Sequence, residues 1–89
     1  MSTEKKEMRT KSDILCDLTG KIVTLWCMNY IYTGKLSLVD GDCVMLDEAK
    51  IVYETGPLME KTWKDAQPLP SPVFVMLSAV ESFGVQKQA

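Results

Sequence analysis

The chain has 89 residues, 46% of them hydrophobic, so it has room for one folded domain with a modest core. The formal net charge of −2 and the pI near 5.0 argue against a strongly basic nucleic-acid binder, whose affinity comes mostly from neutralising phosphates. Cys16, Cys27 and Cys43 lack metal-ligand spacing, and the chain has no histidine. We therefore expect reduced thiols, no metal, no cofactor and a cytoplasmic protein.

The first segment, residues 1–11, is polar and charged, and we expect it to be a flexible tail. It lacks the apolar stretch of a signal peptide, and no later run approaches the length of a membrane span, so no membrane partner is expected. A short helix is predicted from Ser12 to Thr19. Ser12 would cap it, Asp13 favours the positive helix end, and Gly20 is a typical residue after a helix.

Alternation of apolar residues predicts five strands, at residues 21–28, 32–39, 43–53, 73–77 and 80–85. In the second strand, Gly34 lies on the apolar face, which indicates a sharp bend or the close approach of another backbone. Asp40-Gly41 is a turn pair that tolerates positive φ. The apolar residues of the third strand change phase near Asp47-Glu48, as a bulge would require.

The segment between the third and fourth strands, at about residues 54–72, contains all four prolines and Trp63. A structureless loop of that length is uncommon in a compact domain, so we expect a helical turn around residues 58–66, pinned by Trp63. Trp63 with Lys61 and Lys64 is alternatively a platform on which nucleic-acid bases could stack. Anchoring of the loop is the simpler interpretation of Trp63.

Residues 32–40 read Tyr-Thr-Gly-Lys-Leu-Ser-Leu-Val-Asp and are followed by Val-Met-Leu-Asp-Glu-Ala at residues 44–49. These segments resemble the first sequence motif of the Sm/LSm/Hfq family of RNA-associated ring proteins, and residues 75–82 resemble the Hfq-type second motif. The resemblance implies a mainly β fold, in which a short N-terminal helix precedes a strongly bent five-stranded antiparallel barrel. This domain would occupy residues 12–86, with the insertion at about 54–72 and a tail at 87–89.

The resemblance also implies a homo-oligomeric ring of about five to seven protomers, in which the fourth strand of one copy pairs with the fifth of the next. Independently, the run from Val73 to Leu77 is wholly apolar, and an exposed edge of that kind would aggregate unless it were paired. The alternative is a central strand in a monomer. The expected interface residues are Val73, Phe74, Val75, Met76, Leu77, Val80, Ser82 and Phe83.

Members of this family bind single-stranded RNA at the turns after the second and fourth strands, where a base is stacked and phosphates meet positive charge. In this chain the family's aromatic, basic and histidine positions hold Asp42, Leu77 and Ser78, and the acidic Asp42 would repel phosphate. For the Asp40-Gly41-Asp42 segment, an ordinary β-turn is the alternative. The candidate RNA-binding residues are Tyr30, Lys35, Asp40, Gly41, Asp42, Leu77 and Ser78.

The leading hypothesis is an Sm-like ring-forming protein that binds or scaffolds single-stranded RNA. The alternative is a structural or protein-interaction oligomer of the same fold that has lost RNA binding. An enzyme is not expected, because the sequence has no histidine, no glycine-rich phosphate loop and no nucleophile elbow. The acidic residues from Asp40 to Glu48 lack the spacing of a calcium loop, so no metal is expected there.

Overall fold

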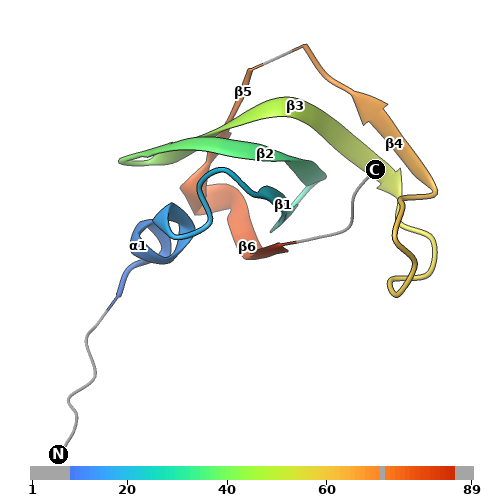
Figure 1. Cartoon of the computed structure of the whole chain (residues 1–89), viewed down its shortest axis with the longest axis horizontal. Coiled ribbons are helices and arrows are strands. Elements are labelled where there is room, and N and C mark those ends of the chain that lie inside the picture. Colours follow the sequence, from blue (N-terminus) through green and yellow to red (C-terminus); the bar gives the residue numbers. More distant parts are fainter. Residues whose placement is uncertain (1–8, 71, 86–89) are drawn as a thin grey trace, which may run out of the picture.

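The computed structural model describes residues 9–70 and 72–85, and it consists mainly of β-strands with one short α-helix (Figure 1). This confirms the expected mainly β class. The elements are α1 (Lys11–Cys16), β1 (Ile22–Cys27), β2 (Ile31–Asp40), β3 (Cys43–Glu54), β4 (Asp65–Pro68), β5 (Val73–Met76), the 3₁₀ helix η1 (Leu77–Ala79) and β6 (Val80–Val85). All strand pairs are antiparallel, in the order β4-β3-β2-β1-β6, and β5 pairs with β3.

The structure differs from the expected strongly bent five-stranded barrel in the number of strands and in closure. The described residues form a six-stranded sheet that is not closed. The long β3 has two successive partners on one side, β5 opposite Cys43–Leu46 and β4 opposite Lys50–Glu54. β4 was not predicted because Asp65-Ala-Gln-Pro68 has neither β-branched nor aromatic residues, and its proline is rare inside strands.

The helix α1 begins earlier than predicted, because Thr10 caps it and not Ser12. The backbone N–H of Asp13 donates to Thr10 Oγ1, and the Asp13 carboxylate accepts from the Thr10 N–H, at 3.1 Å in each case. These hydrogen bonds, with the nearby Arg9, hold the pKa of the Asp13 carboxyl below its usual value. Lys11 is therefore the first residue of a helix and not part of a flexible tail.

A sharp bend in β3 curves the sheet around the core (Figure 1). Glu48 has a φ of 53°, and the pairing register of β2 with β3 shifts between Thr33 and Lys35, opposite this residue. The phase change predicted near Asp47-Glu48 is thus confirmed as a bulge. The core inside the curve contains Leu15 from α1 together with strand residues, among them Val23, Leu25, Leu36, Val44, Leu46 and Val75.

The insertion between β3 and β4 does not form the predicted helical turn. The chain turns at Leu58-Met59, and Trp63 then packs back onto β1, where its ring meets that of Trp26 edge-on at a centroid distance of 6.2 Å. Trp63 is 8% exposed, so it is a loop anchor and not an accessible stacking platform. The last two residues of the predicted turn, 65 and 66, belong to β4.

Candidate nucleic-acid interface

The β2–β3 turn and η1 lie side by side, although 35 residues separate Asp42 from Leu77 in the sequence. The backbone N–H of Leu77 donates to the carbonyl oxygen of Asp42 at 2.7 Å and ties the two segments together. Gly41 has a φ of 58°, which glycine adopts without steric cost. The two turns that the resemblance singles out therefore form one continuous surface.

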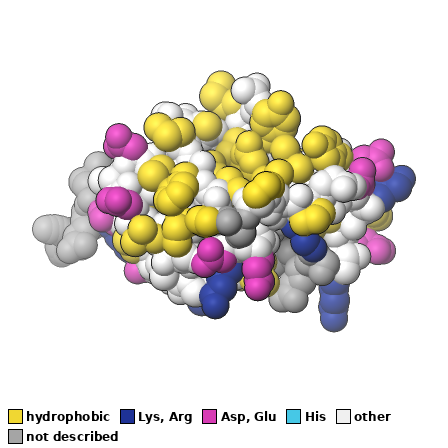
Figure 2. All heavy atoms as spheres, turned by 90° about the horizontal axis from the view of Figure 1, so that it is seen from above, with side chains coloured by type: hydrophobic (Ala, Val, Ile, Leu, Met, Phe, Trp, Pro, Cys, Tyr) yellow, Lys and Arg dark blue, Asp and Glu magenta, His cyan; other side chains and the backbone are white. Residues whose placement is uncertain are grey.

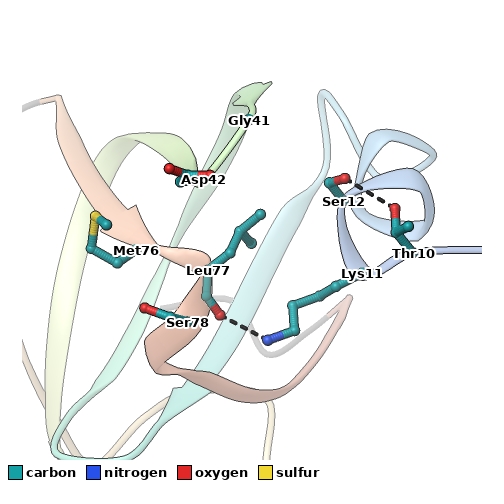
Figure 3. A pocket seen from close by; sticks show the side chains of 8 residues that line it. All are labelled: Thr10, Lys11, Ser12, Gly41, Asp42, Met76, Leu77 and Ser78. Carbon is teal, nitrogen blue, oxygen red and sulfur yellow. Dashed lines mark hydrogen bonds between the residues drawn. The ribbon is translucent and has the colours of Figure 1, made fainter.

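A pocket of about 410 Å³, open to solvent, lies where this surface meets the start of α1 (Figure 3). That volume is within the range of small-molecule sites. Its walls come from three segments, the cap and first turn of α1, the β2–β3 turn, and the β5–η1 junction. The lining residues are Thr10, Lys11, Ser12, Gly41, Asp42, Met76, Leu77 and Ser78.

Lys11 connects the start of α1 with the β5–η1 junction. Its ammonium donates to the Leu77 carbonyl oxygen at 2.7 Å and to the Val80 carbonyl oxygen at 2.9 Å (Figure 3 draws the first of these). Both hydrogen bonds are partly buried, and they span the length of η1. The side chain therefore fixes α1 against the turn that leads into β6, and it brings a positive charge to the Leu77 backbone.

The rest of the lining contains both polar and apolar side chains. The hydroxyls of Thr10 and Ser12 are hydrogen-bonded to each other at 3.1 Å, and Ser78 is an exposed hydroxyl on η1. Met76 supplies apolar surface, and Asp42 adds a carboxylate to the lining (Figure 3). None of the eight lining residues is aromatic, so the pocket offers polar and charged contacts and no ring on which a base could stack.

Four of the seven candidate RNA-binding residues line the pocket, namely Gly41, Asp42, Leu77 and Ser78. Leu77 does so mainly through its backbone, since its side chain is buried in the core. Asp40 is exposed at the end of β2, beside the pocket but outside its lining.

The remaining two candidates lie elsewhere. Lys35 is exposed in the middle of β2, opposite Ile22 of β1. Tyr30 precedes the start of β2, at the opposite end of the strand from the pocket. Tyr30 is 53% exposed, and the centre of its ring lies 6.2 Å from that of Tyr32. Partial burial raises the pKa of the Tyr32 phenol. These two residues share no site with the β2–β3 turn.

Sequence reasoning missed four lining residues, Thr10, Lys11, Ser12 and Met76. The sequence pattern places Thr10 and Lys11 in a tail and Ser12 at a helix cap, and it suggests only a subunit interface for Met76. No local signal identifies Lys11, because its position depends on carbonyl groups 66 and 69 residues further along the chain. The capping box Thr10-x-x-Asp13 is visible in the sequence, and it would have moved the helix start to the correct residue.

A second surface of interest is an apolar patch on the outer face of the sheet. Leu38, Met45 and Phe74 are cross-strand neighbours on β2, β3 and β5, and Met76 follows Phe74 on the same face. Leu38, Phe74 and Met76 are 45%, 58% and 54% exposed. Figure 2, which looks at the molecule from above, shows hydrophobic side chains gathered over the middle of this face, with charged side chains around it. We call these four residues the edge patch.

The eight expected interface residues differ in burial, and two of them, Phe74 and Met76, belong to the edge patch. Phe74, Met76 and Ser82 are exposed, and Val73 and Phe83 are half-buried. The other three, Val75, Leu77 and Val80, are buried within the chain itself.

Comparison with protein-family models and with curated proteins finds no match to this chain. Within residues 9–70 and 72–85, no helix has the length and apolar character needed to cross a membrane. The same residues contain no cluster of three cysteine, aspartate or glutamate side chains that could hold a metal ion.

Proposed function

We propose that this chain is an Sm-like self-assembling module that binds single-stranded RNA at the pocket between the β2–β3 turn and η1. The proposal rests on one observation. Three candidate residues, Gly41, Asp42 and Ser78, line the same pocket, and the backbone hydrogen bond from Leu77 to Asp42 joins the two segments from which they come. The sequence resemblance, which takes no account of spatial proximity, assigns RNA contact to these same two turns. A pocket of about 410 Å³ is large enough for one nucleotide at this junction.

Self-assembly is supported by the two edges of the sheet. Among the described residues, β5 pairs on one side with β3, β6 pairs on one side with β1, and each leaves its other side open. Open edges beside exposed apolar side chains favour pairing with another chain. In the proposal, β5 of one copy pairs with β6 of the next, and about five to seven copies complete a ring.

The outer side of β6 can accept such a neighbour. A Cβ added at Gly84 would meet nothing within 4 Å, so a side chain from another copy has space over this residue. Phe74 of an adjoining β5 is on the matching outer face, and an aromatic ring over an edge glycine is a stabilising cross-strand arrangement. Pairing would thus bury part of the edge patch together with two unpaired backbone edges.

A second candidate function is a structural or protein-interaction ring that does not bind RNA. The Asp42 carboxylate in the pocket favours it, because a negative charge there repels phosphate. The lack of an aromatic ring among the eight lining residues also favours it, since stacking on such rings supplies much of the affinity for single strands.

The test is fluorescence anisotropy of short U-rich and A-rich RNAs titrated with the purified protein, at low and at physiological salt. Light scattering on the same samples gives the number of copies. Binding that persists at physiological salt and differs between the two RNAs supports the first function. A multimer that binds neither RNA at either salt supports the second, and a monomer contradicts the assembly in both.

Asp42→Asn and Asp40→Asn form a matched pair for this assay. Both remove one negative charge from the same turn, but Asp42 lines the pocket and Asp40 does not. The hydrogen bond from Leu77 is retained in both variants, because it ends on the backbone of residue 42. If RNA enters the pocket, Asp42→Asn binds it more tightly, by up to about fivefold from a charge interaction of about 1 kcal/mol in water. Equal effects of the two variants would contradict RNA binding in the pocket.

A further inference from the structure

We propose that Lys11, the first residue of α1, is the cation that contacts phosphate in this pocket. In the family's motif a basic residue occupies the position that Leu77 occupies in this chain, and Lys11 would supply the positive charge there. The inference rests on the proposed function, because the phosphate it assigns belongs to single-stranded RNA. Residue 77 supplies no charge of its own. The ammonium of Lys11 lies 2.7 Å from the Leu77 carbonyl oxygen and so brings a charge to the same backbone position.

The hydrogen bonds of Lys11 orient its ammonium without cancelling its charge. An ammonium has three N–H donors, and the Leu77 and Val80 carbonyls accept two of them. The third can donate to a phosphate oxygen. Because two donors are already held, little side-chain freedom is lost when the third engages a ligand, which favours binding.

Lys11 is the basic residue among the eight that line the pocket, and the other charged groups near the start of α1 have contacts outside it. Arg9 is bound to Asp17, with Nη2 to Oδ2 at 2.6 Å, so it is directed along the outside of the helix. Asp13 is held by the Thr10 backbone in the capping box. Asp42 is the acidic residue of the lining, and its charge repels phosphate. An incoming phosphate would therefore lie on the α1 side, away from Asp42.

Three hydroxyl groups also line the pocket. Thr10 and Ser12 lie next to Lys11 in the sequence and line the pocket from α1, and Ser78 lines it from η1 (Figure 3). Hydroxyls donate to phosphate oxygens without adding charge. One ammonium with neighbouring hydroxyls is a weak site in isolation, but a ring would present one in each copy, and several weak sites on one RNA strand reinforce each other.

The test compares Lys11→Gln with Lys21→Gln. Glutamine keeps an N–H donor near the carbonyls of η1 and removes the charge, while Lys21 is an exposed lysine outside the pocket. RNA affinity is measured over a series of salt concentrations. If Lys11 binds phosphate, Lys11→Gln reduces the slope of log affinity against log salt by about 0.7 for each phosphate that is no longer neutralised, and Lys11→Arg restores it. Lys21→Gln should leave the slope unchanged.

A purely structural role for Lys11 gives a different result. In that case Lys11→Gln lowers the melting temperature, and the salt slope of any remaining RNA binding equals that of the wild type. Such a result would overturn the inference and leave the proposed function standing.

A second measurement covers the case in which the wild type binds no RNA. Uridine 5′-monophosphate is titrated into the protein, and the backbone amide signals of Thr10, Leu77 and Ser78 are followed by NMR. Shifts in the wild type that disappear in Lys11→Gln support Lys11 as a phosphate ligand while the RNA function fails. No shift, together with no RNA binding, overturns both.

Discussion

Gly34 lies directly against Ala49, so closely that a Cβ at residue 34 would be 3.0 Å from the Ala49 Cα. The same Cβ would be 3.0 Å from the Asp47 carbonyl oxygen. This is where Glu48 adopts its positive φ and β3 bends across β2. Glycine at residue 34 is therefore what allows the two strands to stay in contact through the bend.

Replacing Gly34 with alanine should lower the free energy of unfolding by about 1–3 kcal/mol, because the added methyl meets backbone atoms that cannot move aside cheaply. Chemical denaturation at one fixed protein concentration measures the change. Gly84→Ala is the matched control, since its Cβ would have no neighbour within 4 Å in the single chain, and the concentration is chosen so that the protein is monomeric. Equal stability of Gly34→Ala and the wild type would contradict a steric need for glycine at the bend.

Much of this bend was predictable from local sequence. Gly34 on an apolar strand face and the phase change at Asp47-Glu48 both follow from period-two alternation, and both are features of the structure. The turn at Asp40-Gly41 was equally readable. Such features depend on residues within a few positions of one another, so the sequence displays them directly.

The parts that were not predicted depend on distant partners. The sequence of β4 has no strand-like pattern, and the segment is extended because its backbone pairs with the second half of β3. In the sequence, Lys11 looks like any lysine in a charged segment, and only the fold brings the carbonyl groups of η1 and of the first residue of β6 beside it. Tertiary contacts of this kind override local propensity, and a single sequence does not reveal them.

Replacing Trp63 with alanine should destabilise the protein by about 3 kcal/mol, since the variant lacks a large buried side chain that packs on Trp26. Thermal melting measures the effect, and the fluorescence of the remaining tryptophan should report greater exposure to water. Leu58→Ala, at an exposed residue of the same loop, is the control and should have little effect. A Trp63→Ala variant as stable as this control would show that the loop needs no anchor.

Replacing Phe74 with lysine should reduce the size of the assembly, because a charge on the edge patch opposes burial against β6 of a neighbouring copy. Phe74 is the right position for this test. Val75, its neighbour, is 5% exposed, so a lysine there would disrupt the core of the single chain. Light scattering after size-exclusion chromatography gives the mass.

Met59→Lys is the control for the Phe74 variant. Met59 is 95% exposed in the β3–β4 loop and belongs to neither β5 nor β6. It should keep the wild-type mass. If Phe74→Lys also kept that mass, assembly would not use the β5 edge.

The thiol groups should differ in their reaction with an alkylating reagent. Burial raises the pKa of the Cys27 thiol, although the nearby Lys11 charge opposes this, whereas Cys16 is exposed. Because the thiolate is the reactive form, a raised pKa leaves less of it at any given pH. Near neutral pH, Cys16 should therefore be labelled well before Cys27, and alkaline pH should accelerate Cys27. Mass spectrometry of labelled peptides measures both rates, and in denaturant the difference should vanish.

The walls of the pocket come from residues 10–12 near one end of the described chain and from residues 76–78 near the other. During synthesis the first wall leaves the ribosome well before the last is made, so a nascent or truncated chain cannot present the site. A ligand of this pocket would therefore bind only chains that are complete and folded. Its binding would also stabilise more than one hairpin, because α1, the β2–β3 turn and the β5–η1 junction must all be in place before the walls meet.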